Sequence, residues 1–153
     1  MLARWSFVLA ALLLFAGALL HVVVLAAGPE WIAFVGAPAE VVRSAERGTW
    51  LAPVSTLGIA ALLAGLAVYA LAAAGKLRPL PLVKPILGLF AAIFVVRGLI
   101  ILPALAQGRV NWAAPVDVFI VTSSLAILVL GAALCLGLWA LRGTRQPPTD
   151  PRP

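Results

Sequence analysis

Apolar residues follow one another along this chain in four long, almost uninterrupted stretches. They occupy residues 5–27, 51–74, 86–106 and 113–141. A helix needs roughly 20 mostly apolar residues to cross the hydrocarbon core of a bilayer, and each stretch is at least that long. The pattern therefore predicts an all-α fold, an integral membrane four-helix bundle that forms a single transmembrane domain over residues 1–142.

The composition supports a membrane protein. Hydrophobic residues make up 64% of the 153 residues and charged residues only 10%, which is too little polar surface for a soluble domain of this length. The segments between the stretches are also too short to hold a soluble catalytic domain of about 100 residues or more. We therefore expect the lipid bilayer to be the main surroundings of the chain.

The first stretch has an alternative interpretation as a cleaved signal peptide over residues 1–27. Arg4 precedes the apolar run, and residues 25–27 (Leu-Ala-Ala) resemble a small-residue cleavage site. The apolar part of a signal peptide runs for only about 7 to 15 residues, and this stretch is longer. We expect an uncleaved helix.

Basic residues mark one side of the predicted bundle. Lys76, Arg78 and Lys84 lie between the second and third stretches, and Arg4 and Arg142 lie near the two ends of the chain. Loops on the cytoplasmic side of a membrane carry an excess of Lys and Arg. We therefore predict cytoplasmic N and C termini. The polar, proline-rich segment 143–153 is expected to be a disordered cytoplasmic tail.

Residues 28–49 form the longest predicted loop, on the extracytoplasmic side. Pro38 suits the first position of a short helix over 38–47, which Gly48 would end. Such a helix, with its charges outward, would lie at the membrane interface. The loop could be an interfacial connector or a lid over the bundle.

Four polar side chains inside the apolar stretches form the candidate site. They are His21, Ser55, Arg97 and Asp117, one from each stretch. At about 1.5 Å per residue along a helix, all four would lie in the same outer layer of the membrane. Because a charged group in lipid costs free energy, we expect Arg97 to be met by other groups. The sequence predicts a polar cluster around Arg97, with Asp117 as the first candidate for an ion pair.

Each of these residues also has a structural interpretation. The Arg97 side chain could extend to the headgroups or pair with Glu30 or Glu46 in the loop. Asp117 could stabilise the start of the fourth helix, where the helix dipole favours a carboxylate. His21 could be a hydrogen-bonded packing residue. The sequence leaves these alternatives open.

The numbers of cysteine and histidine residues exclude several types of functional site. The chain has one cysteine, Cys135, and one histidine, too few for a thiol pair, a bis-histidine haem site or a histidine-based metal cluster within one chain. No nucleophile elbow or phosphate-binding glycine loop is present. The basic residues are spread over separate loops, so they do not indicate nucleic-acid binding. We expect no catalytic, cofactor-binding or metal-binding residues.

Small residues repeat along one face of the second stretch. Gly58, Ala61 and Gly65 lie three and four positions apart, a spacing that lets helix backbones approach closely in a membrane. They predict a packing surface for another helix. The partner could be a helix of the same chain, a second copy, or another membrane protein.

A resemblance adds a setting but no activity. The segments GAPAEVVRSAERGTWLAP and IFVVRGLIILP, the helix that contains Tyr69 and the PLPL turn between them resemble uncharacterised small four-helix membrane proteins of bacteria, over about residues 30–105. The resemblance implies a bacterial inner membrane and no known catalytic residues. We expect a non-enzymatic accessory or assembly protein. The alternative is binding or transport of a small molecule, anion or lipid around Arg97.

Overall fold

The computed structural model describes residues 1–142, and the predicted disordered tail 143–153 lies outside the described residues. Every element in the described part is a helix, which confirms the all-α fold class. The bounds are α1 Leu2–Ala27, α2 Pro29–Phe34, α3 Ala39–Glu46, α4 Leu51–Ala73, α5 Val83–Leu99, α6 Leu102–Ala106 and α7 Pro115–Arg142.

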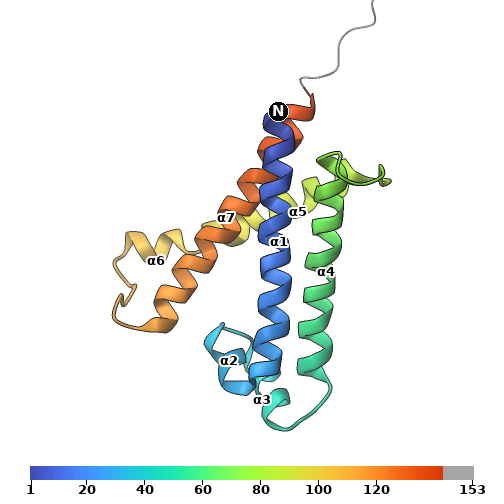
Figure 1. Ribbon diagram of the computed structural model, residues 1–153. Coiled ribbons are helices and arrows are strands. Elements are labelled where there is room, and N and C mark those ends of the chain that lie inside the picture. Colours follow the sequence, from blue (N-terminus) through green and yellow to red (C-terminus); the bar gives the residue numbers. More distant parts are fainter. Residues whose placement is uncertain (143–153) are drawn as a thin grey trace, which may run out of the picture.

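Four segments of the described chain are long and apolar enough to cross a membrane. They are α1, α4, α7 and the segment Val83–Ala106, which contains both α5 and α6. The predicted multi-pass membrane protein is therefore confirmed at this level. The N-terminus lies at the same end of the molecule as the C-terminal end of α7, whereas α2 and α3 lie at the opposite end (Figure 1).

The long helices pack in the order α4, α1, α7, α5. α1 packs along both α4 and α7, and α7 packs along α5, whereas α4 and α5 contact each other much less. The four helices are thus packed together but do not form an evenly closed ring. Figure 1 shows that α7 diverges from α1 toward its N-terminal end, so α6 and the start of α7 stand apart from the α1–α4 pair.

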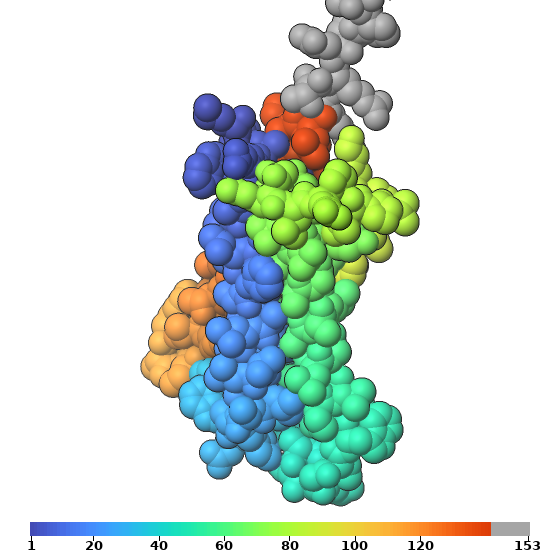
Figure 2. Space-filling view, turned by 45° about the vertical axis from the view of Figure 1, so that its right-hand side comes forward, coloured from blue at the N-terminus to red at the C-terminus, as the bar shows by residue number. Residues whose placement is uncertain are grey.

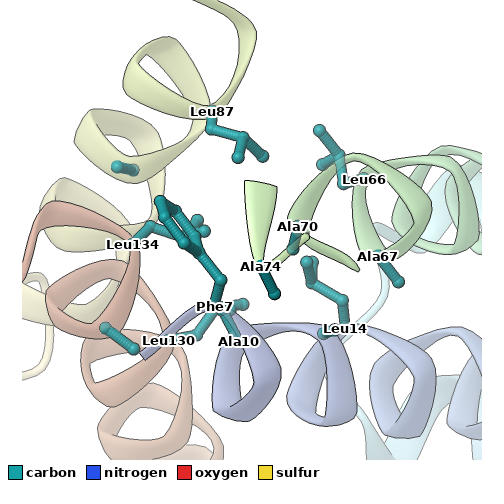
Figure 3. Packing of buried hydrophobic residues seen from close by; sticks show 13 residues of the cluster. Phe7, Ala10, Leu14, Leu66, Ala67, Ala70, Ala74, Leu87, Leu130 and Leu134 are labelled. Atoms are coloured by element: carbon teal, nitrogen blue, oxygen red, sulfur yellow. The ribbon is translucent and has the colours of Figure 1, made fainter. Parts of the chain in front are cut away.

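The core is densest where α1, α4, α5 and α7 meet near the chain's N-terminus. Phe7, Leu14, Leu87 and Leu134 are fully buried there, surrounded by alanines such as Ala10 and Ala70 of neighbouring helices (Figure 3). Because alanine occupies little space, the helix backbones can approach one another. Gly137 has the same effect, since a Cβ at this position would lie 2.8 Å from the Phe7 ring.

Glycines bring α5 and α7 together in the same way. A Cβ at Gly98 would lie 2.7 Å from the Leu128 Cβ and 2.8 Å from its backbone nitrogen, and a Cβ at Gly131 would lie 2.8 Å from the Val95 nitrogen. These distances leave no room for a side chain on either glycine. The α5–α7 contact is therefore close backbone packing.

The third predicted helix, residues 86–106, is two helices. α5 ends at Leu99 and α6 begins at Leu102. Pro103 accounts for the break, because proline has no N–H to donate to the carbonyl of Leu99 and is tolerated only in the first turn of a helix. In Figure 1, α6 lies level with the middle of α1 and does not reach the level of α2 and α3.

The length of α5 follows from this break. Its 17 residues span about 25 Å at 1.5 Å per residue, which is less than the roughly 30 Å of a typical hydrocarbon core. Arg97 consequently lies in the last turn of α5, where the negative end of the helix dipole favours a cation.

Candidate functional site

Arg97 lies on an exposed face of α5. With Ala92, Ile93, Val96 and Ile100 it lines a shallow, open recess of about 370 Å³ that is almost wholly apolar. Across residues 1–142, the side chain of Arg97 makes no hydrogen bond or ion pair. The one ion pair in that part of the chain joins Arg43 to Glu40 at 3.3 Å. The expected ion pair between Arg97 and Asp117 is therefore not formed in this structure.

Asp117 lies in the first turn of α7 and orders the turn that leads into it. Its Oδ2 accepts a hydrogen bond from the backbone nitrogen of Asn111 at 2.8 Å. Asn111 Oδ1 in turn accepts a hydrogen bond from the nitrogen of Ala113 at 3.1 Å. A carboxylate at this end of a helix is also favoured by the helix dipole. These contacts are those of a residue that stabilises the start of α7.

His21 and Ser55 bond to carbonyl oxygens of their own helices. His21 Nδ1 donates to the Gly17 carbonyl of α1 at 2.7 Å. Ser55 Oγ donates to the carbonyls of Leu51 at 2.7 Å and Ala52 at 3.2 Å in α4. Such bonds satisfy a polar side chain within an apolar helix without any partner from another helix.

The structure distributes the four residues over two helix pairs. His21 and Ser55 belong to α1 and α4, which pack together, and Arg97 and Asp117 belong to α5 and α7, which also pack together. No hydrogen bond joins any one of the four to another. That the four bind a ligand together stays a prediction.

Residues 28–49 form two short helices, whereas the sequence predicted one over 38–47. The predicted helix corresponds to α3, and α2 was missed although Pro29 and Glu30 are typical of a first helical turn. α2 contacts α7 through the rings of Phe34 and Phe119, whose centroids are 5.3 Å apart. This segment is therefore packed against the bundle at its α7 side.

Ser44 is the most connected polar side chain of this segment, and the sequence did not single it out. It is buried, and its Oγ accepts a hydrogen bond from the nitrogen of Ala52 at 2.9 Å and lies 2.7 Å from Thr49 Oγ1. Ala52 belongs to the first turn of α4, whose N–H groups have no partner within the helix. Ser44 therefore caps α4 from α3. The only signal for it in the sequence is a hydroxyl pair shortly before an apolar run.

The small residues of α4 point away from the rest of the described chain. Gly58, Ala61 and Gly65 are exposed, and a Cβ added at Gly58 or Gly65 would meet nothing within 4 Å. Gly98 and Gly131, by contrast, face another helix of the same chain at contact distance. The α4 stripe is thus not used for packing among residues 1–142. Figure 2 shows α4 (green) at the molecular surface along its length.

Among the described residues, no group of three or more His, Cys, Asp or Glu side chains is placed to hold a metal ion. Comparison with models of protein families, with curated proteins and with solved structures finds no match. The resemblance to small bacterial membrane proteins thus gains no family from these comparisons. The chain is a small all-α protein with four helical segments suited to crossing a membrane.

Proposed function

We propose that this chain is a non-enzymatic accessory or assembly protein of a bacterial inner membrane, with both termini in the cytoplasm, that binds a transmembrane helix of a partner protein. The observation that carries the proposal is the exposed stripe Gly58, Ala61 and Gly65 on α4, with open space at both glycines. The basic residues near the chain ends and in the α4–α5 turn support the orientation.

A helix is the occupant that the stripe fits best. Lipid chains are as apolar as leucine, so helices associate in a membrane through close packing at small residues. Glycine within a helix forgoes about 1 kcal/mol of helix propensity relative to alanine, and at Gly58 and Gly65 no contact within the described chain requires it. Close contact with the backbone of a second helix would require a small residue such as glycine at these positions.

A photo-cross-linking experiment in native membranes tests this proposal. Benzoylphenylalanine replaces Ala61 in the full chain, and the matched control carries it at Leu12, which is 62% exposed on α1. We expect one discrete adduct from position 61 and none from position 12. Gly58→Leu combined with Gly65→Leu should abolish the adduct without disturbing the fold, because both positions face open space.

The mass of the adduct identifies the occupant. An adduct of the mass of this chain plus a different polypeptide supports the proposed partner. An adduct of twice the mass of this chain assigns the stripe to a homo-oligomer and replaces the partner by a second copy. No adduct, or equal adducts from positions 61 and 12, would overturn α4 as a helix-binding surface.

A further inference from the structure

We propose that Arg97 and the apolar recess that it helps to line bind one phospholipid, with the guanidinium on the phosphate and an acyl chain along α5. This site is separate from the α4 stripe. It involves only the exposed face of α5 formed by Ala92, Ile93, Val96, Arg97 and Ile100.

The side chain of Arg97 is exposed and makes no hydrogen bond or ion pair within residues 1–142. A cation without a partner in a membrane segment is costly. The planar guanidinium presents paired donors that match two oxygens of a phosphate. Phospholipid phosphates are already ionised and are present in every leaflet, so they are the nearest anions to a lipid-exposed arginine.

The surface beside Arg97 is apolar and built from bulky side chains. The recess of about 370 Å³ is lined by branched aliphatic side chains, Ile93, Val96 and Ile100, beside Ala92. Helix-binding faces in membranes are enriched in small residues, as on α4, and this face is not. Bulky aliphatic side chains next to a cation match an acyl chain next to a phosphate better than they match a second helix.

Arg97 lies in the last turn of α5, before the break that separates α5 from α6. An arginine within a membrane segment draws headgroups and water inward. The phosphate on Arg97 would therefore lie deeper in the membrane than the phosphates of the surrounding leaflet. This depth would distinguish the bound lipid from bulk lipid.

The experiment is native mass spectrometry of the full chain in detergent, titrated with dioleoylphosphatidylglycerol. Dioleoylglycerol lacks the phosphate, and glycerol 3-phosphate lacks the acyl chains. The variants are Arg97→Gln, Arg97→Lys and the control Arg109→Gln, which removes an exposed arginine outside the spans. Circular dichroism checks that each variant is folded.

We expect the wild type and Arg109→Gln to retain one phosphatidylglycerol and Arg97→Gln to bind it about tenfold more weakly, the usual effect of losing a charge-assisted hydrogen bond. Arg97→Lys, which keeps the charge but loses the paired donors, should fall between them. Neither dioleoylglycerol nor glycerol 3-phosphate should be retained.

Equal retention by wild type and Arg97→Gln would overturn the proposal. Retention of glycerol 3-phosphate would assign Arg97 to a soluble phosphate, and equal retention of dioleoylglycerol would show that the phosphate makes no contact. If Arg97→Gln leaves lipid binding unchanged but removes a co-purifying membrane protein, the face binds a protein instead. The α4 cross-linking result is independent of all these outcomes.

Discussion

The glycines of the long helices fall into two groups, which differ in what a side chain at the glycine would meet. Gly98 and Gly131 let α5 and α7 approach to backbone contact, whereas Gly58 and Gly65 face open space. The sequence could suggest close packing at any of these positions, because all lie in apolar helices. Only the tertiary structure separates the glycines that face a neighbouring helix at contact distance from those that face open space.

A substitution at Gly98 should therefore destabilise the fold. In Gly98→Ala the new Cβ would lie within 2.8 Å of the Leu128 backbone, and overpacking of this kind costs about 1 to 3 kcal/mol. The matched control on the same helix is Gly88→Ala, whose Cβ would lie 3.9 Å from Leu138 Cδ1, an ordinary contact. The free energy of unfolding, measured by dodecyl sulfate titration in mixed micelles, should fall for Gly98→Ala alone. Equal values for the two variants would contradict the close α5–α7 contact.

The surroundings of Arg97 were only partly predictable from the sequence. Its position in an apolar stretch marked it as unusual from the sequence. Its surroundings depended on Pro103 ending the helix nearby and on α7 covering the opposite face, through Gly98 and Leu128. The partner expected for it, Asp117, bonds instead to Asn111 in the chain just before α7.

At the scale of elements, the segment between α1 and α4 contacts the long helices at two positions. Phe34 of α2 packs on Phe119 of α7, and Ser44 of α3 bonds to the first turn of α4. The sequence predicted α3 from Pro38 and Gly48, because those signals are local. The sequence did not predict either contact, because both involve residues that come close only when the helices pack together.

Loss of the Ser44 hydroxyl should weaken the join between α3 and α4. Ser44→Ala leaves the buried nitrogen of Ala52 without its acceptor, at an expected cost of about 1 to 3 kcal/mol. The control is Ser55→Ala, since Ser55 bonds only to carbonyls of its own helix and its loss should change stability by less than about 0.5 kcal/mol. Hydrogen exchange of the amides in 44–54 should also accelerate for Ser44→Ala. A larger loss of stability for Ser55→Ala than for Ser44→Ala would refute this role.

At the scale of the whole molecule, the structure places the N-terminus and the C-terminal end of α7 together, opposite α2 and α3 (Figure 1). Which end faces the cytoplasm is a separate prediction, because no membrane orientation is contained in the packing of helices. It depends on Lys76, Arg78 and Lys84 in and near the α4–α5 turn.

Cysteine labelling tests that orientation. In a Cys135→Ala background, Arg47→Cys and Arg109→Cys should react with a membrane-impermeant maleimide in intact spheroplasts, and Arg78→Cys only after permeabilisation. All three positions are exposed, so a lack of reaction reports sidedness and not burial. Reaction at position 78 in intact spheroplasts would reverse the predicted orientation.

The length and hydropathy of a stretch are local properties, so the sequence was enough to predict an all-helical fold with four segments suited to a membrane. The order α4, α1, α7, α5 and the unpacked face of α4 depend on how the helices pack against one another. Residues that face lipid and residues that face another helix are equally apolar, so hydropathy does not distinguish them. Similar depth along separate helices likewise did not bring His21, Ser55, Arg97 and Asp117 into contact, because backbone groups of their own helix or of the adjoining turn lie within reach of three of them. Of the four side chains, only that of Arg97 has no hydrogen bond or ion pair among the described residues.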